Sequence, residues 1–244
     1  MTNLLLYGGY FEYYMMGILL IPGLILAIYA QIKVNHAVHN YSQIPASCGK
    51  TGAEVARLLL DSAGLHDITI KRVKGNMTDY YDPKNKVLAL SNTTHDSTSV
   101  AALGIATHEV GHALQYKAGY FPIKLRNIAI PLANFASVIM WPLAIIGLIL
   151  SFVVLSDTLI GNIFLWAGIA SFGLAVIVNL VTLPVEFNAS KRATQILHDS
   201  HLLQGDENKY AKEVLDAAAL TYVASLVIAI LDLLRFILVF ADRE

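Results

Sequence analysis

Two histidines and a glutamate stand at a spacing that could build a metal site. Residues 108–112 read His108-Glu109-Val110-Gly111-His112. On an α-helix, positions i and i+4 lie on one face, so both imidazoles would point at one ion while Glu109 could reach a water bound to it. This H-E-x-x-H pattern is typical of a catalytic zinc site. The alternative is two histidines on a helix face beside an exposed glutamate, with no metal.

The residues around the motif predict the helix that it requires. Ser97 and Thr98 can cap the start of a helix, and residues 101–107 favour its propagation. Gly119, followed two residues later by Phe121-Pro122, should end it. We therefore expect both histidines on a single helix.

The composition is that of a membrane protein. The chain of 244 residues is 56% hydrophobic and 14% charged, with a mean hydropathy of +0.57. Its apolar residues concentrate in four segments, at about 4–30, 128–155, 159–183 and 218–240, each long enough to cross roughly 30 Å of hydrocarbon. Residues 1–14 contain no Lys or Arg, so we interpret the first segment as a retained anchor rather than a signal peptide. We predict a mainly α-helical polytopic membrane protein with about four transmembrane helices and a small cytoplasmic zincin-like α+β domain.

The positions of the basic residues predict the topology. Of 17 Lys and Arg, 11 lie within 31–127 and 4 within 185–217. Because basic residues near span ends favour the cytoplasmic side, both polar segments, and the active site with them, should face the cytoplasm of a multi-pass cell-membrane protein. The N-terminus, the turn at 156–158 and the tail at 242–244 would lie outside.

The predicted domain organisation has five segments. They are a transmembrane anchor (1–30), a cytoplasmic zincin-like domain (31–127), transmembrane helices two and three (128–183), a cytoplasmic helical segment (184–217), and a fourth transmembrane helix with a short tail (218–244). The net charge of −1 argues against a nucleic-acid partner. The single cysteine, Cys48, excludes an intramolecular disulfide.

Helix and strand signals precede the motif. Thr51 and Glu54 have the spacing of a capping box, and Gly64 should close the amphipathic helix that follows. Residues 68–73 and 87–91, with a turn at 82–85 between them, predict a hairpin. A free strand edge there could bind an extended peptide, although a purely structural hairpin fits the pattern equally well.

Catalytic zinc usually takes three protein ligands and one water, so two histidines need a partner. Glu186 is the most telling candidate, because a carboxylate at the end of a predicted span is costly unless it is neutralised. A metal could neutralise it, and so could an ion pair with Lys191 or Arg192.

Ser190, one helical turn later, shares the face of Glu186 and could support a ligand or simply lie on the surface. The other candidates are carboxylates on the same membrane side and the histidines at positions 36, 39, 66, 95, 198 and 201.

Several motifs together resemble one family. They are HEVGHALQ at 108–115, PVEFNASKRA at 184–193, TGAEVA at 51–56, the turn at 81–83 leading to 90–91, and LTYVA at 220–224. In this combination and order they resemble the YugP-type family of bacterial membrane zinc metallopeptidases, which is similar to the gluzincin group. The resemblance implies that Glu186 is the third ligand. The family pattern usually has Asp where this chain has Asn188, which keeps a hydrogen-bonding carbonyl but loses the charge.

The predicted function is a zinc-dependent endopeptidase with one Zn²⁺ per chain, held by His108, His112 and Glu186. Glu109 would deprotonate the zinc-bound water that attacks a peptide carbonyl, and would pass the proton to the leaving amine. Tyr222, at the cytoplasmic end of the fourth span, is the first candidate for stabilising the oxyanion, although an interfacial tyrosine is commonly just a membrane anchor. Arg192, His198 and His201 are the further candidates for that role.

The expected partners are the lipid bilayer and protein or peptide substrates close to the membrane. An alternative is a non-catalytic, zinc-stabilised membrane scaffold or adaptor that binds partner chains. An intact Glu109 favours the enzyme, because a structural zinc site has no use for it. A zinc transporter is a weaker third possibility, since its ligands would be expected in the middle of the membrane. The sequence leaves the oligomeric state open.

Overall fold

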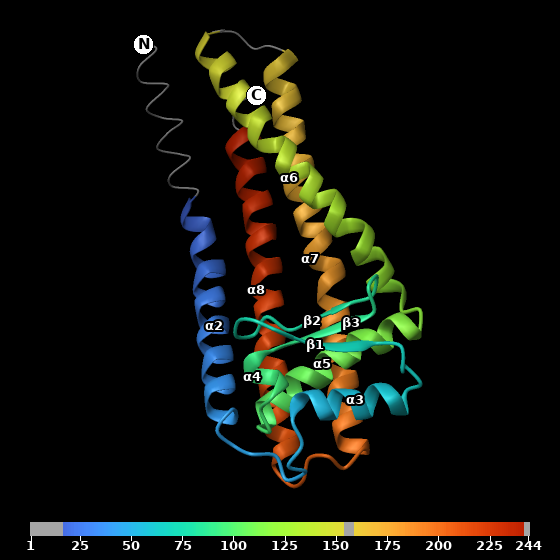
Figure 1. The fold of residues 1–244 in the computed structure, drawn as a ribbon. Helices are drawn as coiled ribbons and strands as arrows, with labels where there is room; N and C mark the ends of the chain where they lie inside the picture. Colours follow the sequence, from blue (N-terminus) through green and yellow to red (C-terminus); the bar gives the residue numbers. More distant parts are fainter. Residues whose placement is uncertain (1–16, 154–158, 242–244) are drawn as a thin grey trace. The chain divides into compact units, whose positions relative to one another are not determined.

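The computed structural model describes residues 17–153 and 159–241, which are mainly helical with one small sheet (Figure 1). The helical elements are η1 (Gly17–Leu20), α2 (Ile21–Tyr41), α3 (Gly52–Ser62), α4 (Asn92–His95), α5 (Val100–Lys117), α6 (Phe121–Val153), α7 (Leu159–Asp199) and α8 (Glu207–Ala241). The strands are β1 (Thr69–Val73), β2 (Tyr80–Asp82) and β3 (Val87–Ser91). The predicted combination of long helices with a small sheet is confirmed.

The chain divides into two compact units. The first unit comprises Met1–Ile28, Lys124–Thr182 and Val223–Glu244, and the second comprises Tyr29–Ile123 and Leu183–Tyr222. All residues proposed above as metal ligands, as well as Glu109 and Tyr222, fall in the second unit.

Apolar helices dominate the first unit. Among the described residues, three helices are long and apolar enough to cross a membrane: Gly17–Tyr41, Trp166–Asp199 and Glu207–Leu238. They correspond to the first, third and fourth predicted spans. The second predicted span falls in α6, whose side chains are not described at 137 and from 139 to 153, so a fourth span stays a prediction. Residues 1–16, which include Glu12 of the predicted anchor, lie outside the described part of the chain, as do the turn at 156–158 and the tail at 242–244.

A glycine allows two helices of the first unit to approach closely. A Cβ atom added to Gly23 would lie 3.0 Å from Ile228 Cγ1 and 3.1 Å from Leu231 Cδ1. Small residues at such contacts let helix backbones pack tightly in a membrane, where association depends on packing rather than on the hydrophobic effect. Gly23 therefore leaves room for the side chains of α8 that pack against α2 within this unit.

The sheet of the second unit differs from the predicted hairpin. The strand order is β1-β3-β2, with β1 parallel to β3 and β2 antiparallel to it. The predicted turn does form, because Asp82 Oδ1 accepts hydrogen bonds from the backbone N–H groups of Lys84 (2.9 Å) and Asn85 (3.1 Å). However, the turn joins β3 to β2, a strand of three residues that is too short to show alternation, while β1 pairs with the opposite side of β3. The free edges among the described strands are therefore those of β1 and β2.

The capping box at the start of α3 is confirmed. Glu54 N–H donates to Thr51 Oγ1 at 3.2 Å, and the Thr51 N–H donates to Glu54 Oε2 at 2.7 Å. The helix ends at Ser62, and Gly64 follows with φ of 69°, a conformation that glycine adopts without strain. This fixes both ends of the helix, which packs its apolar face against α5.

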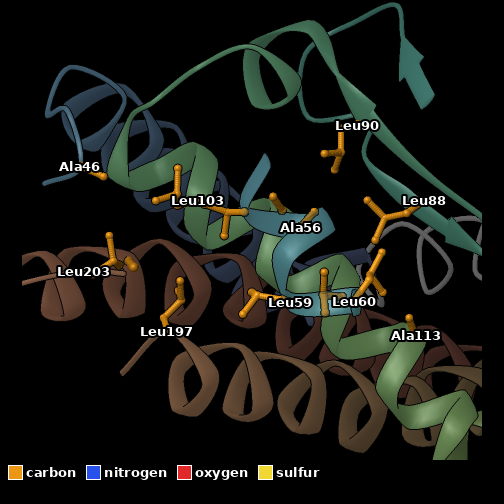
Figure 2. Packing of buried hydrophobic residues seen from close by; sticks show 14 of the residues in the cluster. Ala46, Ala56, Leu59, Leu60, Leu88, Leu90, Leu103, Ala113, Leu197 and Leu203 are labelled. Carbon is orange, nitrogen blue, oxygen red and sulfur yellow. The ribbon is translucent and has the colours of Figure 1, made fainter. Parts of the chain in front are cut away.

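The core of the second unit joins segments that are distant in the sequence (Figure 2). Leu59 and Leu60 of α3, Leu103 of α5 and Leu88 of β3 are buried together with Leu197 of α7. Burying such side chains contributes about 1.5–3 kcal/mol each, so this cluster helps to hold α5 and the end of α7 in place.

Helices α7 and α8 continue beyond the predicted spans. α7 is one helix from Leu159 to Asp199, with Pro184 inside it, and α8 begins already at Glu207. The predicted polar segment 184–217 is therefore the end of α7, a short connection and the start of α8. The loss of hydropathy near residue 184 marks the end of an apolar stretch but not the end of the helix.

Candidate metal centre

Helix α5 carries both histidines, as predicted, but it begins later than the sequence indicated. Its N-cap is Ser99, whose Oγ accepts a hydrogen bond from Ala102 N–H at 3.2 Å. Ser97 contributes by donating its hydroxyl to Ser99 Oγ at 2.9 Å. Gly119, with φ of 62°, follows the last turn. The predicted caps, Ser97 and Thr98, are thus corrected to Ser99, the residue whose hydroxyl reaches the open first turn.

The imidazoles of α5 converge on a carboxylate from α7. His108 Nε2 lies 3.2 Å from Glu186 Oε2, and His112 Nε2 lies 3.5 Å from the same oxygen. The two rings are 4.8 Å apart and nearly perpendicular, at 86°. Glu186 is only 2% exposed. A carboxylate this deeply buried must be compensated by positive charge or hydrogen bonds, and both histidines face it.

The second nitrogen of each ring is also engaged. His108 Nδ1 lies 3.2 Å from Ser190 Oγ, and His112 Nδ1 lies 3.0 Å from Gln115 Oε1. In metal sites a histidine ligand usually donates its other ring N–H to such an acceptor, which fixes the ring orientation. Both rings are therefore held with Nε2 toward Glu186.

Close packing of α5 on α7 brings these groups together. A Cβ atom added to Gly111 would lie 2.7 Å from the Ala189 carbonyl oxygen, which is closer than real Cβ atoms approach. Glycine at this position lets the backbone of α7 lie directly on the helix of His108 and His112. The carboxylate of Glu186 can reach both rings because of this contact.

We predict that Gly111→Ala destabilises the second unit and weakens metal binding. The new methyl group must push α7 away from α5, at a cost of about 1–3 kcal/mol typical of overpacking, which exceeds the benefit of about 1 kcal/mol that alanine normally brings to a helix. Thermal unfolding in detergent and zinc content would measure both effects. The matched control is Gly104→Ala on the same helix, where the new Cβ would meet Ala211 Cβ at an ordinary 3.6 Å. Equal behaviour of the two variants would contradict the prediction.

Burial shifts the proton affinity of the groups on α5. Glu109 is 8% exposed, and this burial raises the pKa of its carboxyl, although the nearby His112 and His108 oppose the shift. For His112, burial lowers the pKa, but the hydrogen bond with Glu186 and the neighbouring carboxylates outweigh it and raise the pKa overall. A carboxylate with a raised pKa holds a proton more readily, which is the property a general base needs near neutral pH.

The donor set fits a zinc ion. Zinc bonds to histidine nitrogen and carboxylate oxygen at about 2.0–2.1 Å in tetrahedral geometry, so two ligand atoms should lie about 3.3 Å apart. The distances of 3.2 and 3.5 Å from Glu186 Oε2 to the two Nε2 atoms bracket this value. Donor atoms of His108, Glu109 and His112 also lie within 4.8 Å of one another. Two carboxylates are thus near the histidines, and Glu186 has the separation expected of a ligand.

The remaining predicted residues are placed as follows. Tyr222 lies half-buried in α8, within the second unit. Arg192 donates its Nε to Asn188 Oδ1 at 2.8 Å, so its guanidinium is anchored on α7. His198 and His201 are exposed, and they line an open surface cavity of about 510 Å³ with Gln204. Their exposure makes these two histidines poor candidates for stabilising charge in a water-excluded site.

The other histidines considered as ligands have different neighbours. His36 lies 3.0 Å from Asn40, His66 pairs with Asp61 and His95 pairs with Asp96. Histidines at positions 36, 39 and 66 are exposed. Within residues 17–153 and 159–241, no group of three or more His, Cys, Asp and Glu side chains that could hold a metal contains any of these other histidines.

Sequence reasoning missed the contribution of Gln115. It is fully buried and contacts both His112 and α7. The sequence could have indicated it through its position three residues after His112, because this spacing places both side chains on the same helix face. The partner residues on α7 lie about seventy positions further along the chain, and no local pattern connects them to α5.

Comparisons with known proteins cover the whole site. A protein family described as "Putative neutral zinc metallopeptidase" matches residues 16–241. The chain is 43% identical over 224 residues to a protein of Bacillus subtilis (strain 168) named "Putative membrane protease YugP", and the match covers 92% of this chain and 96% of that relative. No solved structure shows a significant match. Both matches include α5 with its two histidines and α7 with Glu186.

Proposed function

The chain belongs to the zinc metallopeptidase family that its sequence matches, and from this premise we propose that it is a membrane-embedded endopeptidase that hydrolyses proteins or peptides at the cytoplasmic membrane face. His108, His112 and Glu186 are the proposed ligands of one zinc ion. The single observation that supports this assignment most strongly is the convergence of both Nε2 atoms on the buried Glu186 Oε2, at 3.2 and 3.5 Å.

Each side chain has a defined part in the proposed reaction. When bound, zinc would supply a Lewis acid that polarises the peptide carbonyl and lowers the pKa of a water beside it. Glu109 accepts the proton of that water as it attacks the carbonyl carbon, and then donates the proton to the nitrogen of the breaking peptide bond. The same carboxyl group thus takes up the proton and releases it again. Burial raises the pKa of this group. Tyr222 is the proposed donor to the oxyanion.

The sheet offers a means of holding a substrate chain. β2 contacts α5, and Tyr81 of β2 packs edge-on against Tyr116 of α5 with ring centroids 5.7 Å apart. An extended peptide that pairs with the free edge of β2 would gain main-chain hydrogen bonds close to the site helix. This supports a substrate bound as an extended chain and not as a folded domain.

The proposed membrane side follows from charge. The second unit carries most of the basic residues, since 9 of the 17 Lys and Arg lie within 29–123 and 4 lie within 183–222. Such a bias is characteristic of cytoplasmic segments next to membrane spans. Glu186 lies on a helix that is itself a candidate span, so the favoured substrates are membrane-anchored or membrane-proximal chains.

Metal removal tests the proposed function. The detergent-purified chain is expected to contain one zinc ion and to cleave casein or a panel of membrane proteins. A chelator should abolish cleavage, and stoichiometric zinc should restore it. Zinc in the purified protein without cleavage of any tested substrate would instead favour the non-catalytic scaffold. Cleavage that persists in the metal-free protein would contradict a metallopeptidase.

A further inference from the structure

The geometry points to Gln115 as a positioning residue that holds His112 with its Nε2 toward Glu186. This inference rests on the proposed metal site, and it concerns a residue outside the H-E-x-x-H motif. Gln115 is fully buried, so each of its polar atoms must find a partner within the protein. Its side chain lies between His112 on α5 and two acceptors on α7.

The orientation of the Gln115 amide is fixed by its neighbours. Its Nε2 donates to the Val185 carbonyl at 2.7 Å and to Asn188 Oδ1 at 3.0 Å. Asn188 must present its oxygen here, because Arg192 Nε, which can only donate, lies 2.8 Å from the same atom. With the amide reversed, the Gln115 oxygen would face two acceptors. The amide oxygen therefore faces His112.

This orientation determines which nitrogen of His112 carries the hydrogen. The Gln115 oxygen can only accept, so His112 Nδ1, at 3.0 Å, must donate. The lone pair of a neutral His112 ring is then on Nε2, the atom that lies 3.5 Å from Glu186 Oε2. A chain of oriented groups thus runs from Arg192 through Asn188 and Gln115 to the ring.

The same chain shows why a neutral side chain is sufficient at position 188. Its oxygen accepts from both Gln115 and Arg192, which an aspartate oxygen would also do. The amide carbonyl is enough to orient Gln115, and the charge is not needed for this purpose. His112 is consequently supported by a neutral acceptor, whereas His108 depends on the hydroxyl of Ser190.

The test compares zinc affinity among variants of the full-length chain in detergent, by competition with a chromophoric chelator. Gln115→Met keeps the side-chain volume but removes the acceptor, and is expected to weaken zinc binding on the order of 10–100-fold. Gln115→Glu removes the amide N–H that Val185 and Asn188 accept, as the Met variant does, but keeps an acceptor opposite Nδ1, and should bind zinc more tightly than the Met variant. The matched control, Gln195→Met, makes the same change at an exposed position of α7 and should behave as wild type.

A second measurement follows the exchange of the imidazole N–H hydrogens of the histidine ligands. In the cobalt-substituted wild type, proton NMR should show an exchangeable imidazole N–H for each histidine ligand, and Gln115→Met should accelerate exchange of one of them. Unchanged zinc affinity and unchanged exchange in Gln115→Met would overturn this inference while the proposed function stood. Equal loss of affinity in the Met and Glu variants would also overturn it, since Gln115 would then act only by tying α5 to α7. A wild type that takes up no metal would instead refute the proposed function.

Discussion

Glu109→Gln is expected to abolish peptide hydrolysis while the chain still binds one zinc ion. Gln has the size of Glu and fits the same buried position, but its amide cannot accept a proton from the attacking water. General acid–base catalysis contributes about 10²–10⁴-fold, so the rate should fall by at least the lower value. Zinc content by elemental analysis and cleavage of casein, measured on the same preparation, would check both parts.

The burial of Glu109 makes this test informative. The carboxyl is 8% exposed, and burial raises its pKa, so the group is suited to taking up a proton. The matched control is Glu54→Gln, which makes the same change in the capping box of α3, where glutamine can also serve. This control should retain both zinc and activity.

Two results would contradict the assignment in different ways. Loss of zinc in Glu109→Gln would mean that Glu109 is itself a ligand. This possibility is worth testing because Glu109 lies close to both histidines. Full activity with zinc retained would mean that another group takes the proton. Only loss of activity without loss of metal supports Glu109 as the general base.

The sequence predicted those features that depend on neighbouring residues. The helix of His108 and His112 follows from local periodicity, and the capping box of α3 follows from two residues three positions apart. The cap of α5 was misplaced by one or two residues, because several hydroxyl side chains stand together there and only geometry decides which one reaches the free N–H groups.

Features that depend on tertiary contacts could not be derived in the same way. β1 pairs in parallel with one side of β3, while the short strand β2 pairs antiparallel with the other side. The three residues of β2 give no usable pattern from which this order could be predicted. The position of Glu186 beside the histidines depends on Gly111, where the backbone of α7 packs on α5. The residues alone left several candidates for the third ligand, and the family resemblance narrowed them to Glu186.

Glu186→Gln is expected to remove zinc from the chain and, with it, the activity. The proposed site then keeps two neutral imidazoles but no anionic ligand for a doubly charged ion. If zinc sites contribute about 10–16 kcal/mol over four ligands, one ligand corresponds to about 3–4 kcal/mol, or on the order of 10²–10³-fold in affinity. A chelator competition titration would measure this loss.

The structure also predicts that Glu186→Gln loses zinc without losing its fold. Glu186 is buried against His108 and His112, and glutamine keeps its volume and can donate its amide N–H to the Nε2 lone pair of a neutral ring. Because a neutral amide is cheaper to bury than a carboxylate, metal-free Glu186→Gln should unfold at a temperature close to that of the metal-free wild type. Only the wild type should then unfold at a higher temperature when zinc is added, since a ligand stabilises the state that binds it.

The control Asp216→Asn removes a carboxylate from an exposed pair with Lys212 and should keep the zinc-dependent rise in unfolding temperature. If Glu186→Gln gained as much stability from zinc as the wild type, the third ligand would have to be another residue, with Glu109 the nearest carboxylate on α5.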